Sequence, residues 1–470
     1  MTLSTTYVWV LFPLIIAVIT AVFYQRKLLS ILLTSLSAFA LAAFATFFPE
    51  DMTLSIGPLT LEFKESLNIL GRQISVLYDM LPFIALIYAV TGLWDLSSGI
   101  TGVPGIFRPT SLTMTALLTA ALGVQPFLYA ALLIETTILV SIPTLSPPGQ
   151  KTSPGILRYL TLQTLAMPFI LLAGWLLTGV ETLPADSPLV GQTMFLLGLG
   201  IAIWLAVFPF HSWVPMLSQK TSPLVMSFLL TLMPMTILVF ALNFINRFTF
   251  LRELESLFSS LRVMGVIMIV INGAWLAVQT DIKRALGFSA LSETGFALLA
   301  MGLYDQGGLT LMMLLFPVRA LAFWLWGYIL TNIEQHSDSL ELHALQGFAR
   351  RFPALSSGLL LAQFSLAGLP LLASFPIKIA LFTGAFEVGT ALGIITFFGN
   401  LGLILLTLRL LSFLVTPRDA ALPNRWTFSE KTSEYIPIMI VVLMLIIMGL
   451  FPNTFFANII KTLTVFSQLQ

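Results

Sequence analysis

The sequence predicts an all-α polytopic membrane protein, and two observations carry this prediction. Hydrophobic residues make up 57% of the 470 residues and charged residues only 9%, and the mean hydropathy is +0.97. A soluble domain carries about 25% charged residues, so this composition places the chain in a lipid bilayer. Long apolar segments also recur along the whole sequence, and a helix needs about 20 mostly apolar residues to cross the hydrocarbon core.

These segments predict about fourteen transmembrane helices joined by loops. The expected spans are 6–24, 28–48, 74–94, 110–125, 126–144, 157–178, 193–214, 222–245, 262–279, 285–303, 308–331, 354–383, 390–415 and 434–453. The longest polar stretches, 49–73, 333–353 and 416–433, are short enough to be loops. No soluble domain is therefore expected between the spans.

The basic residues predict an orientation in the membrane. With the N-terminus on the outer side, fourteen Lys and Arg residues fall in cytoplasmic loops or span ends, and six fall on the outer side. Cytoplasmic loops of membrane proteins carry an excess of Lys and Arg. We therefore expect both termini on the periplasmic or lumenal side of a bacterial inner membrane or a thylakoid membrane. The other two basic residues, Arg319 and Lys378, fall deep inside predicted spans.

Four ionisable residues fall within predicted spans: Glu135, Glu293, Arg319 and Lys378. An ionisable group at bilayer depth costs at least about 2.5–3.5 kcal/mol on insertion scales, so such residues are candidates for function. Each also has a structural interpretation, because a protonated Glu135, or an Arg319 that binds backbone carbonyls, could simply hold helices together. Lys378 is the strongest candidate for proton transfer, because it follows a predicted helix break and desolvation favours its neutral form.

Proline residues interrupt two of the spans. Pro209 lies in the seventh span, and Pro370 and Pro376 lie in the twelfth. Interrupted helices at corresponding positions are typical of inverted repeats, so we expect two inverted five-helix repeats, spans 4–8 and spans 9–13, with helices 7 and 12 broken. The expected organisation is 1–109 for spans 1–3, 110–245 and 262–415 for the two repeats, and 434–470 for the last span and tail.

Several classes of function are disfavoured. The chain has no Cys, which excludes thiolate metal sites and Fe–S ligation, and its three His residues are too few and too scattered for a metal cluster. A net charge of +1 gives no reason to expect a nucleic acid partner, and the sequence holds no Gly-rich nucleotide loop. A porter with a midplane substrate pocket would need a cluster of polar residues that the spans lack. We expect no cofactor, no metal and no directly bound soluble substrate.

Five segments carry motifs that point to a family. "AVQTDIKRALGFSALSETGFALLAMGL" (277–303) is similar to Q-x-D-I-K-R-x-L-A-Y-S-S…G, and "FPFHSWVPMLSQKTSPLVMSFLL" (208–230) is similar to P-x-H-x-W-L-P-x-A…A-P…S-x-L-L. "SLAGLPLLASFPIK" (365–378) resembles S-L-x-G-I-P-P-x-x-G-F-x-x-K, "RALAF" (319–323) resembles K-A-L-L-F, and "LIETTIL" (133–139) resembles a glutamate-bearing span. In this order, over about residues 110–452, the motifs resemble the antiporter-like membrane subunits shared by respiratory complex I, membrane-bound hydrogenases and Mrp cation/proton antiporters.

The resemblance implies a line of buried charged residues that moves protons, with other membrane subunits of a multi-subunit complex and the lipid bilayer as partners. In this family a glutamate on the fifth span pairs with a lysine on the broken seventh, and the line ends at a lysine or glutamate on the broken twelfth. By matching position, Glu135 corresponds to the glutamate, Lys378 to the terminal residue and Arg319 to the lysine of K-A-L-L-F. His211 is the motif histidine, and with Glu293 it completes the expected proton path.

The chain also departs from the family pattern. Trp204 stands where the seventh-span lysine is expected, and no basic residue occurs in 193–210 or in 222–245. Without a cation beside it, Glu135 is expected to be neutral at pH 7, and Arg319 cannot release its proton under working conditions. We therefore expect impaired proton conduction through the first repeat.

Three hypotheses for the function remain. The first is a membrane-arm subunit of a proton-translocating complex I-type energy-converting complex, driven by electron transfer in partner subunits. The second is a degenerate structural or assembly subunit with impaired proton conduction. The third is a subunit of a Mrp-type cation/proton antiporter or of an inorganic-carbon uptake complex. Whether the chain serves an enzyme stays open at this point, and the subunits that co-purify with it would discriminate the three hypotheses.

Overall fold

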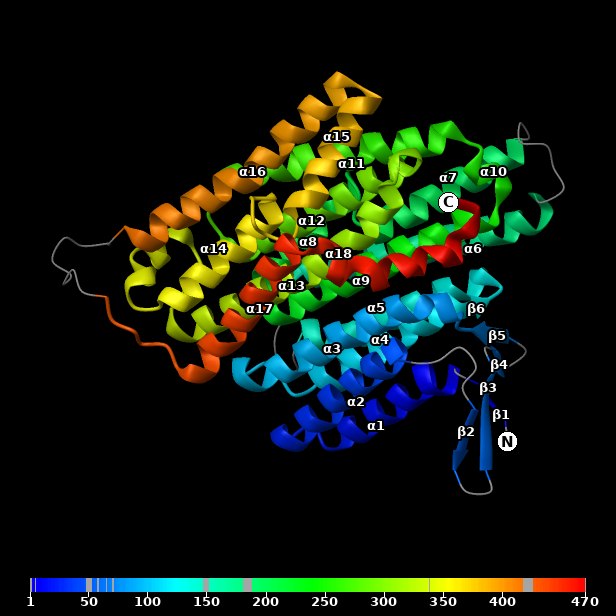
Figure 1. The fold of residues 1–470 in the computed structure, drawn as a ribbon, viewed down its shortest axis with the longest axis horizontal. Helices are drawn as coiled ribbons and strands as arrows, with labels where there is room; N and C mark the ends of the chain where they lie inside the picture. The colour runs from blue at the N-terminus through cyan, green and yellow to red at the C-terminus, as the bar shows by residue number, and fades with distance from the viewer. Residues whose placement is uncertain are drawn as a thin grey trace. The chain divides into compact units, whose positions relative to one another are not determined.

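The computed structural model shows a nearly all-helical protein (Figure 1). It describes residues 2–4, 6–47, 53–56, 59–64, 66–69, 72–146, 152–180, 188–337, 339–416 and 426–469. The α-helices are α1 Phe12–Val22, α2 Lys27–Phe47, α3 Leu81–Thr101, α4 Phe107–Gly123, α5 Ala130–Leu145, α6 Pro154–Val180, α7 Pro188–Trp204, α8 Trp213–Lys220, α9 Pro223–Arg247, α10 Thr249–Arg252, α11 Glu255–Val278, α12 Ile282–Gly302, α13 Gly308–His336, α14 Pro353–Ala367, α15 Phe375–Val388, α16 Thr390–Val415, α17 Thr432–Leu450 and α18 Pro452–Ile460.

Short helices of other types connect several of these elements. They are the π-helix η1 Tyr7–Leu11 and the 3-10 helices η2 Tyr78–Met80, η3 Phe127–Tyr129, η4 Phe210–Ser212, η5 Tyr304–Gln306, η6 Leu342–Leu345, η7 Phe348–Arg350 and η8 Lys461–Leu469. The strands are β1 Thr2–Ser4, β2 Thr53–Ile56, β3 Leu59–Lys64, β4 Ser66–Ile69, β5 Arg72–Ser75 and β6 Val124–Gln125.

The helices follow the predicted spans closely. Each of the fourteen predicted segments overlaps one α-helix or two consecutive α-helices. Within the described residues, ten helical segments are long and apolar enough to cross a membrane, and shorter apolar helices such as α7 and α14 form parts of interrupted segments. The chain is therefore an integral, multi-pass membrane protein, while the number of crossings stays a prediction.

The expectation of an all-α fold is incomplete, because the described residues include two small sheets. One sheet has the strand order β1–β3–β2 and the other the order β4–β5–β6. In the first, β2 and β3 are antiparallel and pair Ile56 with Leu59, and the intervening residues are Gly and Pro. Gly-Pro is a strong turn signal, and "TLSI" before it and "LTLEFK" after it alternate polar and apolar residues as strands do.

Helix α3 begins and ends seven residues later than predicted. The strand β5 and the short helix η2 occupy the first residues of the predicted span 74–94, and α3 starts where Pro82 stands in its first turn. The helix ends at Gly102, whose φ of 70° is a left-handed conformation that glycine adopts at low cost. As a result α3 includes Asp95, which the prediction left in a loop.

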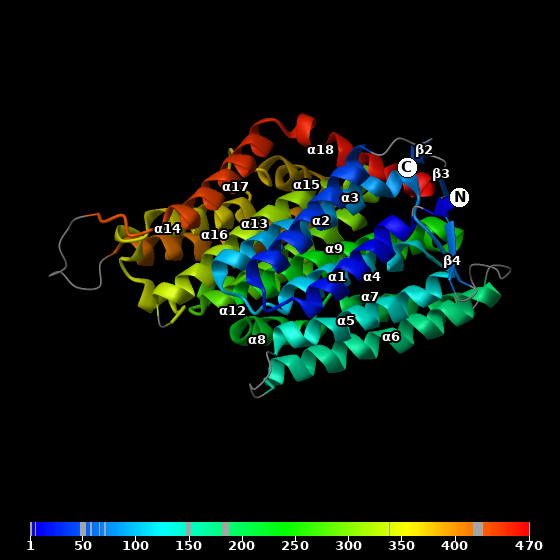
Figure 2. The ribbon, with the colours of Figure 1, turned by 90° about the horizontal axis from the view of Figure 1, so that it is seen from below.

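The chain forms two compact units. Unit 1 comprises Met1–Leu205, Leu232–Leu254 and Lys461–Gln470, and unit 2 comprises Ala206–Thr231 and Glu255–Ile460. In unit 1, α2 and α4 both pack against α3, and α1 packs against α2 and α4. The series continues from α4 to α5, α6 and α7, each packed against the next, with α5 beside α6 in Figure 2.

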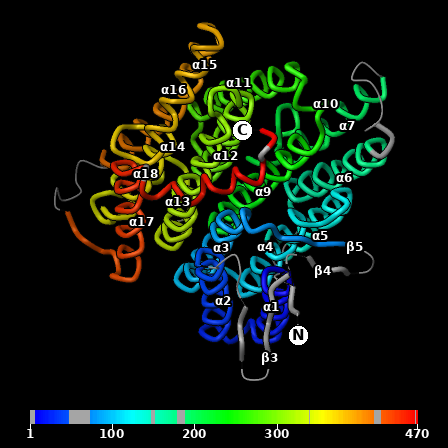
Figure 3. The backbone as a smooth tube through the Cα atoms, turned by 45° about the vertical axis from the view of Figure 1, so that its right-hand side comes forward, coloured from blue at the N-terminus to red at the C-terminus, as the bar shows by residue number. Residues whose placement is uncertain are grey.

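In unit 2, α12 packs against α8, α11, α13 and α15, so it lies inside the unit, and every residue from Ala285 to Gly302 is buried. Helix α16 packs against α11, α14 and α15, and Figure 3 shows it alongside α14 and α15. The crossing of α11 and α16 depends on glycine, because a Cβ on Gly273 would lie 2.0 Å from the carbonyl oxygen of Gly399. Small residues permit such close approach between membrane helices.

Two interruptions of helical structure position the candidate site residues. The first separates α7 from α8 and contains Ala206 with a φ of 52°, and the second separates α14 from α15 and contains Leu371 with a φ of 72°. These are the two described non-glycine residues with positive φ. A residue in this conformation costs about 1–3 kcal/mol, and such residues are concentrated at functional sites. Both breaks are therefore candidate positions for a functional site.

Candidate functional site

Lys378 lies in the first turn of α15, directly after the second break. Pro376 lies in the first turn of this helix. Backbone N–H groups there have no partner within the helix, so a proline costs no hydrogen bond. Gly368, in the left-handed conformation at the end of α14, makes room for the lysine stem, since a Cβ there would lie 2.8 Å from Cδ of Lys378. The break thus places a lysine on a buried helix start, with its side chain against the end of α14.

Lys378 forms a buried ion pair with Glu293 of α12. Its Nζ atom lies 2.8 Å from Oε1 of Glu293, and the side chains are only 1% and 3% exposed. Oε1 receives no hydrogen bond of regular geometry. The attraction between the opposite charges is therefore the main interaction in this pair. Breaking such a pair by removing one partner leaves an uncompensated buried charge and costs about 3–5 kcal/mol.

The remaining partners of Lys378 come from the end of α14 and from α16. The ammonium donates hydrogen bonds to the carbonyl oxygen of Leu366 and, at 3.3 Å, to Oδ1 of Asn400. Asn400 in turn donates from Nδ2 to the carbonyl oxygen of Ala367 at 2.9 Å. The last carbonyls of a helix lack intrahelical donors and carry partial negative charge, so the end of α14 is a favourable site for a cation. The ring of Phe296 adds a cation–π contact at 3.9 Å.

Arg319 lies on α13, and its bond to α9 has a clear local cause. Its NH2 group donates to the carbonyl oxygen of Leu230 in α9 at 2.7 Å. That oxygen would normally accept from residue 234, but residue 234 is a proline without an N–H. The arginine therefore satisfies a carbonyl that Pro234 has freed.

Arg319 also ties α13 to α12 around Glu293. It donates to the carbonyl oxygen of Ala290 at 3.3 Å and to the hydroxyl of Thr294 at 3.1 Å. Its charge interacts with that of Glu293. Glu293 thus lies between two buried cations, of which Lys378 is in direct contact with it and Arg319 is bonded to the turns on either side of it.

Glu135 has different surroundings in unit 1. It is half-buried on α5, and its Oε1 accepts a hydrogen bond of 2.8 Å from the hydroxyl of Thr164 on α6. Its Oε2 has no hydrogen-bond partner among the described residues, and no cation forms an ion pair with it there.

Trp204 fills the position where the family's seventh-span base is expected. The indole is buried at the end of α7 and donates from Nε1 to the carbonyl oxygen of Gln163 on α6 at 3.3 Å. Gln163 donates back to the carbonyl oxygens of Ile203 and Trp204 at 3.3 and 3.4 Å. Phe240 contacts the indole edge-to-face, with ring centroids 6.1 Å apart. This arrangement locks two helices together and offers no titratable group.

His211 lies in η4, within the first break, and is half-buried. Its ring contacts Phe208, with centroids 5.5 Å apart. No hydrogen bond or ion pair within the described part of the chain joins it to Glu293, Arg319 or Lys378. The structure brings three of the five predicted path residues together: Glu293, Arg319 and Lys378. His211 and Glu135 have no hydrogen bond or ion pair with these three among the described residues.

Sequence reasoning missed two buried charged residues in unit 1. Asp95 on α3 is fully buried, and Arg108 at the start of α4 is 2% exposed. The predicted span 74–94 ends one residue before Asp95, and Arg108 lies outside the predicted span 110–125. The signal available was "LWDLSSG", where an aspartate follows an apolar run and precedes small polar residues typical of a helix interface. Asn400 was missed because an uncharged amide carries no such signal.

Comparisons with known proteins agree with the predicted resemblance. NADH-quinone oxidoreductase subunit N 2 of Solidesulfovibrio magneticus is 29% identical over 216 residues, 44% of this chain and 43% of that protein. The chain spans about half the length of the first curated relatives that it matches. These relatives are less than 30% identical to this chain. Their names describe the relatives themselves and do not assign an activity or a partner to this chain.

Solved structures show the same fold. A chain of the Mrp complex from Dietzia sp. DQ12-45-1b superposes with a TM-score of 0.81 at 16% identity, covering 99% of both chains. A chain of respiratory complex I from Thermus thermophilus with bound NADH gives a TM-score of 0.74 at 19% identity, covering 97% of this chain and 99% of that one. Residues 156–403, more than half of the chain, match the family described as NADH:quinone oxidoreductase/Mrp antiporter, transmembrane. The chain therefore belongs to this family of antiporter-like membrane subunits.

Proposed function

We propose that the chain is a membrane-arm subunit of a proton-translocating, complex I-type energy-converting complex, in which it moves protons while partner subunits transfer electrons. The observation that carries the proposal is the buried Lys378–Glu293 ion pair beside the break between α14 and α15. Membership of the family supports it, because the relatives and structural neighbours are named as quinone oxidoreductase subunits and as parts of the Mrp complex and complex I.

Glu293, Arg319 and Lys378 form a buried charge cluster, and their charges favour Lys378 as the residue that exchanges a proton. With Glu293, Arg319 and Lys378 all ionised, the buried cluster carries one net positive charge. Loss of a proton from Lys378 leaves Glu293 and Arg319 as a neutral combination, because arginine stays charged. Arg319 is then the permanent counter-ion of Glu293, and Lys378 is the group that cycles between its two protonation states.

The finer architecture is part of the same proposal. It comprises fourteen crossings and two inverted repeats, with residues 1–109 before the first repeat at 110–245, the second at 262–415, and the last span and tail at 434–470. Both termini lie on the periplasmic or lumenal side of a bacterial inner or thylakoid membrane, and other membrane subunits and lipid surround the chain. The breaks after α7 and α14 support the repeats, since each holds a positive-φ residue.

A specific observation favours a partly degenerate subunit. Trp204, locked to Gln163 on α6, replaces the base of the first repeat, and Glu135 is half-exposed and bonded to a threonine. We propose that proton transfer coupled to electron transfer runs through the second repeat, around Lys378, while the Trp204 and Glu135 positions of the first repeat have a structural role. His211 then marks the motif without carrying protons.

The experiment that tests the proposal is isolation of the intact complex from membranes through a tag on this chain, followed by identification of its subunits. Quinone-reducing and Fe–S subunits are the expected result. Small antiporter chains alone would favour a Mrp-type antiporter, and proteins of inorganic-carbon uptake would favour that machine. Either of these outcomes, or recovery of the chain without partners, would contradict the proposed assembly.

A further inference from the structure

A set of buried polar side chains lies between α3 and α4 in unit 1. On each helix the residues recur every three or four positions, which places them on one face. We call this set the α3–α4 hydroxyl line; it consists of Tyr88, Thr91, Asp95 and Ser98 on α3 and Arg108, Ser111, Thr115 and Thr119 on α4. All eight are buried, none more than 2% exposed. From Ser111 to Thr119 the line runs about 12 Å along α4.

Asp95 has the surroundings of a neutral carboxyl. The hydroxyl of Ser111 donates to its Oδ1 at 2.6 Å, while its Oδ2 is buried without a hydrogen bond of regular geometry among the described residues. Arg108 directs its Nε at Ser98, 2.9 Å away, and no ion pair joins it to Asp95 within the described residues. An ionised carboxylate at this depth is very costly without direct pairing, so the geometry favours the protonated form.

The neighbouring helix α2 contributes one more hydroxyl to the surroundings of Asp95. Thr34 on α2 is within hydrogen-bonding reach of the Asp95 carboxyl. Its own hydroxyl hydrogen is directed at the carbonyl oxygen of Ser30, 3.0 Å away. When the carboxyl of Asp95 is protonated, the hydroxyl oxygen of Thr34 can accept its hydrogen.

Few other charges face Asp95. Helix α4 contributes Arg108, whose charge interacts with that of Asp95. Helix α1 carries no ionisable residue, and α2 carries only Lys27, at its exposed first position. Helix α5, which packs against α4, carries Glu135, and this side chain is bonded to α6. Proton binding at Asp95 is thus controlled by Arg108 and by the surrounding hydroxyls.

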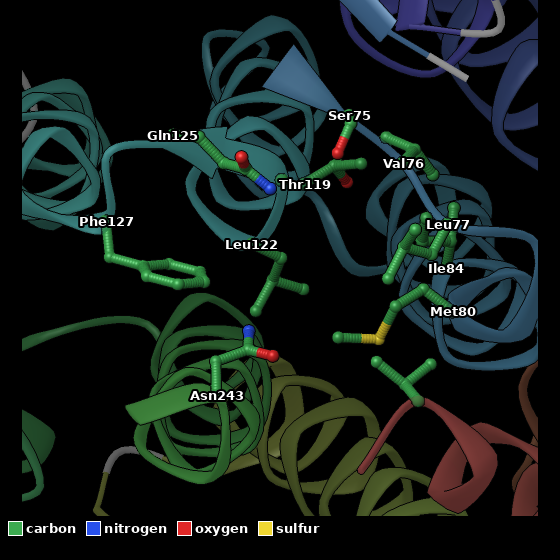
Figure 4. A pocket seen from close by; sticks show the side chains of 12 residues that line it. Ser75, Val76, Leu77, Met80, Ile84, Thr119, Leu122, Gln125, Phe127 and Asn243 are labelled. Carbon is green, nitrogen blue, oxygen red and sulfur yellow. The ribbon is translucent and has the colours of Figure 1, made fainter. Parts of the chain in front are cut away.

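The line leads from Asp95 to a small cavity lined by apolar residues and four polar side chains. The hydroxyls of Thr91 and Thr115 lie 2.6 Å apart, and either of them can be the donor. One turn further, Thr119 lines a cavity of about 50 Å³, together with Ser75, Gln125 and Asn243. Figure 4 shows these side chains around the opening. One water needs only about 10–15 Å³ by this measure and two to four polar partners, so the cavity has room for water.

We propose that Asp95 is a second intramembrane proton-binding site, which exchanges its proton with water in this cavity through the α3–α4 hydroxyl line. The proton adds to the free carboxylate oxygen of Asp95 and leaves by the same route, so no other co-reactant is needed. Arg108 supplies the positive charge that stabilises the ionised form when the proton departs. This site is independent of Lys378 and gives unit 1 a proton-handling group that the altered Trp204 position does not provide.

The competing explanation is a polar cluster that only holds α2, α3 and α4 together. Infrared difference spectroscopy of the full chain in lipid nanodiscs, titrated from acidic to alkaline pH, separates the two. We expect a carbonyl band of a protonated carboxylic acid that titrates in the wild type and is lost in Asp95→Asn. The control Asp79→Asn, at an exposed aspartate of η2, should keep the band. A spectrum identical in wild type and Asp95→Asn at every pH would overturn the proposal.

A second measurement tests the route and does not depend on removing the aspartate. Ser111→Ala should shift the frequency of the band, because it removes the 2.6 Å hydrogen bond to Oδ1. Thr115→Val should slow hydrogen–deuterium exchange of the band about tenfold, the effect of losing one hydrogen bond in the transition state. The matched control is Thr113→Val, half-buried on the same helix outside the line. Equal exchange rates in the two threonine variants would rule out the proposed route.

Discussion

The ammonium of Lys378 and the carboxylate of Glu293 meet at 2.8 Å in the interior of unit 2, joining α15 to α12. The second break is what makes this contact possible, because it frees the carbonyl oxygen of Leu366 and starts a new helix three residues before Lys378. A charge pair this deeply buried is weak evidence for stability, since two apolar residues can do as well. Its presence is better explained by a function that needs charge at this depth.

The first prediction concerns the stability of this pair. Lys378→Met leaves Glu293 buried without its direct partner, so it should lower the free energy of unfolding by about 3–5 kcal/mol. The double variant Lys378→Met with Glu293→Gln should not recover this loss, because it leaves the buried Arg319 without a counter-ion. Denaturant unfolding of the chain in detergent measures both values.

The chain offers a matched control for this measurement. Lys283 and Glu334 are also 2.8 Å apart, but their side chains are 15% and 34% exposed. A partly exposed pair of this kind contributes about 0–1 kcal/mol, so Lys283→Met should have a small effect. If both lysine variants lose the same stability, the buried pair has no special energetic role.

The second prediction separates the charge of Arg319 from its hydrogen bonds. Arg319→Lys keeps the counter-ion of Glu293 but cannot satisfy Leu230, Ala290 and Thr294 together, so it should cost about 1–3 kcal/mol of stability while proton translocation is retained. Arg319→Met removes the charge as well, and translocation should fall about tenfold or more. Proton uptake by proteoliposomes that contain the complex measures the difference. Equal translocation by the two variants would exclude the counter-ion role.

The third prediction concerns Glu135. Because this carboxyl is half-exposed and bonded to Thr164, with no ion-pair partner in the described part of the chain, Glu135→Gln should leave coupling of proton translocation to electron transfer nearly unchanged. The intact complex with this variant is compared with the wild type at equal subunit content. A large loss of coupling would show that the first repeat conducts protons despite Trp204.

The fourth prediction is a pH dependence at a group outside the spans. Glu430, in the segment before α17, accepts a hydrogen bond of 2.8 Å from the backbone N–H of Leu355. Burial raises the pKa of Glu430 above its ordinary value, and the nearby Glu434 adds to the increase. When a group has a raised pKa in the folded state, its contribution to the stability is fully present below the pKa of the unfolded state. That contribution is lost as the pH rises through the pKa of the folded state.

Glu430→Gln should therefore flatten the decline of stability over that acidic range, as followed by thermal unfolding at a series of pH values. Glu387→Gln, at an exposed glutamate of α15, is the control and should leave the profile as it is. An unchanged profile in Glu430→Gln would contradict the expected contribution.

Much of the fold follows from the sequence because apolar length alone dictates membrane helices. The helical segments, both helix interruptions and the buried charges Glu293, Arg319 and Lys378 could be predicted, since apolar runs, proline and charge are conspicuous in the sequence. The contact between Lys378 and Glu293 required three dimensions, because residues 85 positions apart on α15 and α12 meet only through the packing of these helices.

Other features have physical causes that one-dimensional reasoning does not capture. Asp95 was missed because a span boundary moved by seven residues when η2 and β5 took up the start of the segment. The acceptor for Arg319 depends on Pro234 freeing the carbonyl oxygen of Leu230, and its partner helix could not be chosen from the sequence. The two small sheets were missed because apolar length predicts helices and does not report on alternation within a short loop.

The most direct test of the central claim is proton translocation by the intact complex carrying Lys378→Met, measured in proteoliposomes beside Lys283→Met. Subunit content of both preparations is verified first, so that failure of assembly is separated from failure of transfer. We expect Lys378→Met to lower the rate of proton translocation about tenfold or more, and Lys283→Met to stay close to wild type. An assembled Lys378→Met complex that translocates protons at the wild-type rate would contradict the account.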